Sequence, residues 1–430
     1  MSTKRISAIL TVLSLFLFTS LAAPDVRSPT HSFTTLDVPG ATSTDARSIN
    51  ASGQVTGFYT DSSGNHGFVY GGTFTTLDVP GADGGTYPAS INASGQVVGL
   101  YWDGSRSHGF VYSNGTFTTL DVPGATGTGA VSINDSGQVA GSYWDGSHDH
   151  GFVYSNGTFT TLNVPGAIDT QATSINASGQ VVGYYNYYQS PAVHGFVYSN
   201  GTFTILDGPR ALRTWATSIN ASGQVAGIYE DGFCPSHGFL YSSGTFTTFE
   251  DPDASYTTVT SINDSGQVTG SYRKADFTND PDGYSFVYSN GTFTAFKVPG
   301  ANDTEATSIN ARGQVTGSYM HSSGNLHGFI ATPVCATPTV TIHTLTTAPQ
   351  GGFRITGSIT DDGAPLCALV LANGQFMFTC GDALPKGEFD LTVPVDDQRQ
   401  ITLFGFSSGL APFQQTLGPG ALPASVNATR

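Results

Sequence analysis

The chain has 430 residues, only 11% of them charged, and contains 54 glycines. Few charges and many glycines, with abundant threonine and serine, favour short strands joined by tight turns and argue against a helical protein. The formal net charge of −16 at pH 7 excludes nucleic acid and anionic membrane surfaces as expected partners, because both repel an acidic protein.

The first 22 residues have the pattern of a secretory signal peptide. A basic head, MSTKR, precedes the apolar run ISAILTVLSLFLFTSLA, and small residues end it at Ser20 and Ala22. The run is short and a Pro-Asp pair follows soon after, so a cleavable signal is expected rather than a membrane span. We therefore expect a linker over 23–32 and a secreted protein, in the medium or in the periplasm.

A repeat built around the tripeptide Ser-Ile-Asn follows. Its copies are separated by 42, 42, 42, 44, 43 and 47 residues. Their central residues are Ile49, Ile91, Ile133, Ile175, Ile219, Ile262 and Ile309. Each copy predicts a strand ending in SIN, a turn at ASG or DSG, a second strand, a variable loop, a third strand at HGFVY, an Asn-Gly turn and a fourth strand at GTFTTLD. Four short antiparallel strands per repeat are typical of a β-propeller blade.

The seventh repeat lacks a fourth strand, because it ends at HGFIATP. The missing strand, FTTLDVPG from Phe33 to Gly40, precedes the first SIN. Pairing this segment with the last blade would close the ring and set Asp37 opposite His327. The sequence thus predicts an all-β protein with a seven-bladed propeller over 33–333, closed by an N-terminal strand.

The recurring histidine has a predicted partner in every repeat that contains it. Residues that pair across a two-residue turn have a constant index sum, which sets His108 opposite Asp121. The other predicted pairs are His66 with Asp78, His150 with Asn163, His194 with Asp207, and His237 with Glu250. In the sixth repeat Tyr284 and Lys297 replace both partners. Copies spread around a ring cannot converge on one metal ion, so we interpret them as structural cross-strand pairs and expect no metal and no cofactor.

The run HGFVYSNGTFTTLDVPG, followed by SINDSGQVAG, resembles the extracellular repeat family called HAF, after its His-Ala-Phe signature. The middle residue here is Gly in six repeats, and the sixth reads Tyr-Ser-Phe. The resemblance covers roughly Phe33 to Pro333 and implies an exported β-rich repeat protein. The family carries no agreed catalytic residues, so no role transfers to single positions.

After a linker over 334–338 the repeat is gone, and strand-like runs over 339–417 predict a small β-sandwich. Their pattern is similar to that of Ig-like or carboxypeptidase-regulatory-like accessory modules. Cys367 and Cys380 lie symmetrically about an Asn-Gly turn, which predicts a disulfide in an exported protein. The redox state of Cys234 and Cys335 is left open. The tail over 418–430 is expected to be disordered.

The loops after each second strand break the repeat, and function is more often found at such breaks. With the connections between blades they would gather aromatic and acidic side chains on one face. These candidates are Trp102, Asp103, Trp144, Asp145, Tyr185, Tyr187, Tyr188, Trp215, Glu230 and Asp231. Aromatic rings beside carboxylates suit a sugar, and packing between neighbouring blades is the alternative explanation.

No Gly-x-Ser-x-Gly elbow, His-Glu-x-x-His motif or Walker loop is present. We therefore expect a non-enzymatic binding or adhesion protein, or an envelope component, with a carbohydrate or a cell-surface protein as partner. No catalytic residue is assigned. The alternative is a polysaccharide lyase or glycoside hydrolase that uses two of the acidic loop residues.

Overall fold

The computed structural model describes residues 31–334, apart from 233–235, 251–253, 275–282 and 323, and beyond residue 338 it describes only the backbone of eight strands. Residues His31–Val334 form one compact unit and residues from Cys335 onward belong to a second. The predicted signal peptide, most of both linkers, and Cys234 and Cys335 lie outside the described residues.

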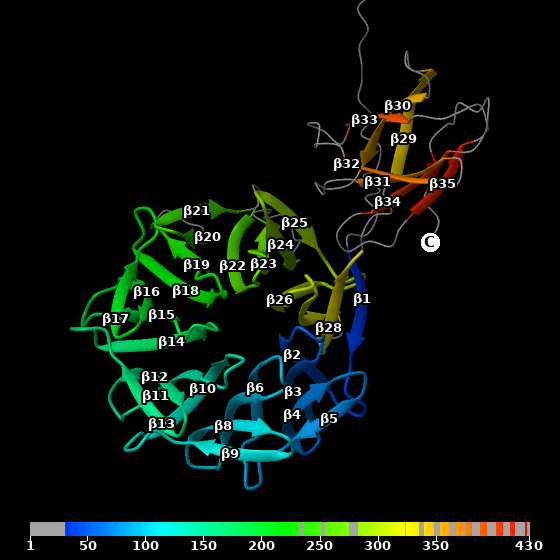
Figure 1. Cartoon of the computed structure of the whole chain (residues 1–430). Helices are drawn as coiled ribbons and strands as arrows, with labels where there is room; N and C mark the ends of the chain where they lie inside the picture. The colour runs from blue at the N-terminus through cyan, green and yellow to red at the C-terminus, as the bar shows by residue number, and fades with distance from the viewer. Residues whose placement is uncertain are drawn as a thin grey trace, which may run out of the picture. The chain divides into compact units, whose positions relative to one another are not determined.

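Every regular element among the described residues is a β-strand, which confirms the all-β fold class. Within that same part of the chain, no helix is long and apolar enough to cross a membrane. The first unit consists of four-stranded antiparallel blades that follow one another around a ring (Figure 1).

Each blade begins with its innermost strand and ends with its outermost. Blade 1 contains β2 (Ser43–Ile49), β3 (Val55–Asp61), β4 (Gly64–Tyr70) and β5 (Phe74–Leu77). Blade 2 contains β6 (Thr86–Ile91), β7 (Val97–Trp102), β8 (Ser107–Ser113) and β9 (Thr116–Leu120). Blade 3 contains β10 (Gly127–Ile133), β11 (Val139–Trp144), β12 (Asp149–Ser155) and β13 (Thr158–Leu162). Blade 4 contains β14 (Asp169–Ile175), β15 (Val181–Asn186), β16 (Val193–Ser199) and β17 (Thr202–Leu206).

The remaining blades follow the same order. Blade 5 contains β18 (Arg213–Ile219), β19 (Val225–Glu230), β20 (His237–Ser242) and β21 (Thr245–Phe249). Blade 6 contains β22 (Ala254–Ile262), β23 (Val268–Lys274), β24 (Gly283–Ser289) and β25 (Thr292–Phe296). Blade 7 contains β26 (Asp303–Ile309), β27 (Val315–Met320), β28 (Leu326–Pro333) and, from the other end of the unit, β1 (His31–Leu36).

The N-terminal strand completes blade 7. β1 pairs antiparallel with β28 from His31 opposite Pro333 to Leu36 opposite Gly328 (Figure 1). One step further along this register, His327 Nδ1 lies 2.9 Å from Asp37 Oδ1. Both contacts agree with the pairing expected from the truncated last repeat. The strand that the seventh repeat lacks is therefore supplied from 290 residues away.

The core of each blade is built around one phenylalanine of its third strand, and these rings are fully buried. A glycine of the second strand faces each ring. At Gly141 a Cβ atom would overlap the backbone oxygen of Gly129 and lie 2.7 Å from the ring of Phe152. The VxGxY pattern of the second strands therefore reflects close packing of three strands rather than a turn. The buried rings are Phe68, Phe110, Phe152, Phe196, Phe239, Phe286 and Phe329.

The Ser-Ile-Asn tripeptides join neighbouring blades. Asn134 Nδ2 donates a hydrogen bond to the backbone oxygen of Asn176 in the next blade at 2.9 Å. The equivalent bonds run from Asn50 to Asn92, Asn92 to Asn134, Asn176 to Asn220, Asn220 to Asn263, Asn263 to Asn310, and Asn310 to Asn50. A second set runs the other way, as where Ile133 N donates to Ser90 Oγ at 3.4 Å. The asparagine and serine side chains of the tripeptides therefore join each blade to the next.

The second unit contains two four-stranded sheets. The first is β33 (Glu388–Val393), β30 (Phe353–Thr360), β29 (Thr339–Thr347) and β36 (Val426–Asn427), and the second is β32 (Gln375–Cys380), β31 (Cys367–Ala372), β34 (Ile401–Phe406) and β35 (Phe413–Leu417). Cys367 and Cys380 are register partners; the disulfide stays a prediction, because side chains here lie outside the described residues. The tail over 418–430 was expected to be disordered, but its residues Val426 and Asn427 pair with β29. An extended tail can add to the edge of a sheet in this way.

Candidate functional site

The variable loops and the connections between blades share one face of the ring, which we call the loop face. Strands within a blade alternate in direction, so each innermost strand starts at the loop face and ends, at Ser-Ile-Asn, on the opposite face. Backbone bonds tie the two kinds of segment together, as where Thr126 N of a connection donates to the oxygen of Trp144 at 2.7 Å. The loop face is thus a fixed surface made of pieces from every blade.

Four of the aromatic candidates are exposed on the loop face. Trp102 ends β7 and Trp144 ends β11, at equivalent places of blades 2 and 3, with 44% and 42% of their surface exposed. Tyr187 and Tyr188 follow β15 in blade 4 and are 40% and 73% exposed. These side chains stand on three consecutive blades, and we call them the aromatic ridge.

Two other aromatic candidates are placed differently from the expectation. Tyr185 is buried, and its ring stacks on His194 with the centroids 5.2 Å apart. Burial raises the pKa of the Tyr185 hydroxyl, with a smaller contribution from Tyr187. Trp215 is half-buried within the innermost strand β18, opposite Ile228. Alternation along β15 turns the Tyr185 ring into the packed sheet, so the expectation that it joins an exposed group was wrong. Trp215 keeps part of its surface exposed.

The acidic candidates beside the ridge are engaged by the protein itself. Asp103 Oδ1 accepts hydrogen bonds from the backbone nitrogens of Ser105 and Arg106, and Asp103 Oδ2 lies 2.9 Å from His108 Nε2. The hydrogen bond from the Ser105 hydroxyl, followed by those from Arg106 N and His108, holds the pKa of Asp103 well below its usual range. Asp103 therefore shapes its own loop.

The other three acidic candidates also contact side chains of the protein, two of them a histidine and one an arginine. Asp145 accepts from Ser147 N and His148 N and lies 3.0 Å from His150, whose hydrogen bond is the main cause of the lowered pKa of Asp145. Asp231 Oδ2 is 4.0 Å from His237 Nε2 in blade 5. Glu230 instead forms an ion pair with Arg213, at 3.3 Å. The sequence pattern did not reveal that loop acids are second partners of the blade histidines.

Every predicted histidine pair is hydrogen-bonded through Nδ1. The distances are 2.9 Å for His66–Asp78, 2.9 Å for His108–Asp121, 2.8 Å for His150–Asn163, 2.9 Å for His194–Asp207, 2.6 Å for His237–Glu250 and 2.9 Å for His327–Asp37. In blade 6 the ammonium of Lys297 lies 5.1 Å from the ring centre of Tyr284. A cation–π contact replaces the imidazole–acid pair there, which explains why both partners change together.

The loop over 187–192 of blade 4 is joined to the connection that leads into blade 5. Val193 N donates to Leu212 O at 3.3 Å, and Arg213 Nε donates to Pro191 O at 3.0 Å. Leu212 is 58% exposed and lies on the connection between these blades. Leu212 was not among the candidates chosen from the sequence, because nothing in the sequence distinguishes this leucine from other apolar residues of the connections. The bridge holds the loop with Tyr187 and Tyr188 against blade 5.

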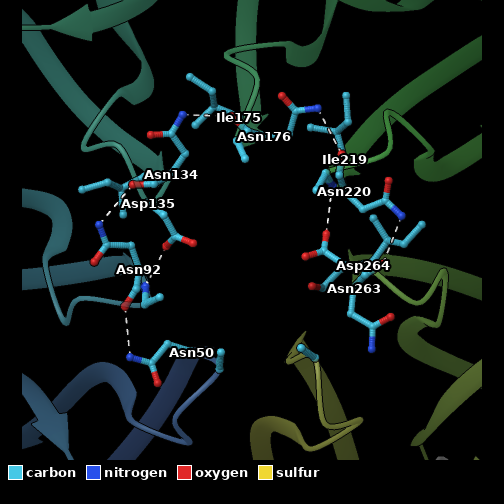
Figure 2. Close-up of a pocket in the computed structure, with 18 of the residues that line it drawn as sticks. Asn50, Asn92, Asn134, Asp135, Ile175, Asn176, Ile219, Asn220, Asn263 and Asp264 are labelled. Atoms are coloured by element: carbon cyan, nitrogen blue, oxygen red, sulfur yellow. Dashed lines mark hydrogen bonds between the residues drawn. The ribbon is translucent and has the colours of Figure 1, made fainter.

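A pocket of about 270 Å³ lies at the centre of the opposite face. The asparagine and isoleucine of the tripeptides line it, and the side chains of Asp135 and Asp264 point into it from two sides (Figure 2). One oxygen of each carboxylate accepts a bond from the preceding blade, from Ala93 N and Ala221 N respectively. None of the predicted candidates lines this pocket.

Charged side chains on the first and second strands of blades 1, 6 and 7 were also missed. Asp45 and Arg47 form an ion pair in blade 1, and Arg273 forms one with Asp303 at 2.7 Å. Burial, and then the nearby Asp303, raise the pKa of Glu305. The sequence could have pointed to Glu305, because this charged residue breaks the repeat: the equivalent positions of blades 3 and 4 hold the uncharged residues Gly129 and Gln171. Within the described residues, no three His, Cys, Asp or Glu side chains are grouped to hold a metal ion.

No family model and no curated protein matches the chain. Solved structures that it resembles include virginiamycin B lyase from Staphylococcus aureus, at 12% identity and a TM-score of 0.46 over 71% of this chain and 100% of that one. The β-propeller domain of the trilobed protease from Pyrococcus furiosus has 8% identity and a TM-score of 0.49 over 68% and 94%. An Aleuria aurantia lectin in complex with Fucα1-6GlcNAc has 11% identity and a TM-score of 0.36 over 63% and 95%. Likenesses at this level carry no argument about function.

Proposed function

We propose that this protein is an exported, non-enzymatic binding protein of the HAF type, whose loop face binds a neutral carbohydrate on the aromatic ridge. The observation that carries the proposal is the placement of Trp102, Trp144, Tyr187 and Tyr188, each at least 40% exposed, on three consecutive blades. Large apolar rings left in water at equivalent places of a repeat favour a ligand-contacting role over a packing role.

A sugar chain suits this surface better than a compact ligand. The ridge extends from blade to blade, and its rings line neither the pocket at the centre of the opposite face nor the one beside Phe249 and Tyr288. A polysaccharide can lay successive rings on successive aromatic faces while its hydroxyls bond to polar loop groups such as Ser105 and Ser147. The formal charge of −16 favours a neutral polymer over an acidic one, because like charges repel.

The alternative, a lyase or glycoside hydrolase, has less support at the predicted acids. A glycosidase needs one carboxyl group with a raised pKa to act as general acid. The pKa values of Asp103 and Asp145 are lowered, chiefly by hydrogen bonds from Ser105 and His150 respectively. Glu230 is held in an ion pair with Arg213. These acids suit fixed loops better than proton transfer.

The test is binding of the mature protein to an array of neutral plant and microbial polysaccharides. We expect Trp102→Ala with Trp144→Ala to weaken binding at least about tenfold, which corresponds to ~1.4 kcal/mol. Ile205→Ala is the matched control, since Ile205 is also 44% exposed but lies on the outermost strand β17. Binding that survives the double substitution, or no binding by the unaltered protein, contradicts the proposal; sugar release that is lost in Asp145→Ala supports the enzyme instead.

A further inference from the structure

The histidine of blade 2 lies between two carboxylates. His108 Nδ1 is 2.9 Å from Asp121 Oδ1, at the end of the outermost strand, and His108 Nε2 is 2.9 Å from Asp103 Oδ2, in the loop after β7. The ring of Tyr101 covers one face of the imidazole, with the centroids 4.9 Å apart. His108 is 7% exposed, so water has little access to its nitrogens.

Such an arrangement needs two protons on the ring. Ionised carboxylates only accept hydrogen bonds, and a neutral imidazole has one N–H, so only the imidazolium can donate to both Asp103 and Asp121. Loss of one proton leaves one carboxylate facing a bare nitrogen at hydrogen-bond distance. The other charged group packed against the pair is Arg106, whose Nη2 lies 3.1 Å from Asp121 Oδ2. Arg106 can hold Asp121 in either state, so Asp103 is the partner that would be released.

Release of Asp103 would affect the aromatic ridge, because Asp103 is next to the ridge residue Trp102. Asp103 follows Trp102 in the chain, and its other oxygen accepts the backbone nitrogens of Ser105 and Arg106. The contact of Asp103 with His108 fastens the start of this loop to the outer part of the blade, and the pairing of Arg106 with Asp121 fastens its end. A change there alters where the neighbouring Trp102 ring stands.

We propose that His108 is a proton-controlled clamp on the start of the loop after β7, which holds Asp103 beside Trp102 when both ring nitrogens carry protons and releases Asp103 when one proton is lost. The clamp regulates the surface described under the proposed function, and its value to the protein rests on that function. Ligand binding by the ridge would then be stronger in acidic than in alkaline surroundings.

Blade 3 shows the same arrangement with one informative difference. His150 Nε2 lies 3.0 Å from Asp145, but its Nδ1 partner is the amide of Asn163, at 2.8 Å. Burial of the ring lowers the pKa of His150, but the bonds to Asp145 and Asn163 and the charges of Asp145 and Asp149 outweigh it, so that the pKa is raised. The rings of Tyr143 and His150 are 5.0 Å apart. Because an amide can turn and donate, a neutral His150 keeps both bonds and Trp144 should move less than Trp102.

The chain has three tryptophans, so fluorine NMR of the mature protein labelled with 5-fluorotryptophan can follow each one, assigned by single Trp→Phe substitutions. Between about pH 5 and about pH 9 the Trp102 signal should shift as the His108 ring loses one proton. The shift should disappear in Asp103→Asn, whose amide can donate to a neutral imidazole, and in His108→Gln. Trp215, inside β18, serves as the internal reference and should stay in place.

A fluorine chemical shift of Trp102 that does not change with pH in the folded protein would contradict the proposed clamp. A pH-dependent shift that persists unchanged in Asp103→Asn would contradict it as well. The outcome does not depend on any carbohydrate. If polysaccharide binding fails while the pH-dependent shift of Trp102 is found, the proposed function is wrong and the clamp stands. If binding is found without the shift, the reverse holds.

Discussion

Asn310 donates a hydrogen bond from Nδ2 to the backbone oxygen of Asn50 at 3.0 Å, across 260 positions of the chain. The same bond is found between all the remaining pairs of neighbouring blades. Asn310 and Asn50 are both buried. Their bond shows that blade 7 meets blade 1 in the same way as blades that follow one another in sequence.

Removal of this bond should destabilise the ring. Asn310→Ala leaves the turn nitrogens of Arg312 and Gln314 without the side-chain oxygen that they donate to, and it removes one of the two hydrogen bonds of the Asn50 oxygen, which keeps the one from Gly53 N. We expect a loss of about 1–3 kcal/mol in the free energy of unfolding, as for other buried polar groups left unsatisfied. Chemical denaturation of the mature protein measures it. Arg312→Ser, which introduces the residue that all six other repeats have there, is the control and should stay within about 0.5 kcal/mol. Equal losses in both variants would contradict this role of Asn310.

Close packing at the second strands gives another prediction. Gly141→Ala places a methyl group against the oxygen of Gly129 and the ring of Phe152, and rigid backbone cannot yield as a flexible side chain would. The cost should reach at least about 1–3 kcal/mol, the usual range for overpacking. Gly129→Ala in the same blade is the control, because its Cβ would lie 3.5 Å from Leu100, an ordinary contact. A Gly141→Ala protein as stable as this control would show that the blade is looser than described.

Acid should weaken the closing strand through His31. The ring lies 4.5 Å from that of Phe296, and burial lowers the pKa of His31 to about 4. The unfolded chain binds this proton at an ordinary pKa of ~6.5, so stability is full above that pH and falls as the pH drops from 6.5 towards 4, by up to about 3 kcal/mol. His31→Phe should remove that part of the pH dependence in denaturation curves.

The control is His148→Gln, since the His148 side chain is 41% exposed. Its curve should keep the acid-induced loss of the unaltered protein. An unchanged pH profile in His31→Phe would mean that the closing strand does not respond to this group.

The predicted disulfide of the second unit can be tested without a structure. Cys367 and Cys380 are register partners of adjacent strands β31 and β32. We expect the two peptides to be linked in a non-reducing digest of the exported protein, and mass spectrometry after thiol alkylation detects the link. Recovery of both cysteines in alkylated form would contradict the prediction.

The regular repeat made it possible to predict the ring of blades from the sequence. The contacts of the candidate site could be predicted only in part, because they involve loops that differ from repeat to repeat. A constant index sum across the tight turn gave the His108–Asp121 contact, because register in an antiparallel pair is fixed by the turn. Asp37–His327 followed from placing the N-terminal strand where the seventh repeat lacks its fourth strand. The second contact of His108 with Asp103 depends on how an irregular loop folds back, which no period encodes. Trp215 shows a different limit: its residue type suggested a surface role, while alternation along β18 decides its burial.

The central claim is that β1 belongs to the ring as the outermost strand of blade 7. Amide hydrogen exchange of residues 31–37, followed by mass spectrometry, tests it most directly, with β9 of blade 2 as the internal standard for an outermost strand. If β1 is part of blade 7, peptides from the two strands should be protected to a similar degree. Exchange of residues 31–37 at the rate of an unstructured peptide, with β9 still protected, would contradict it.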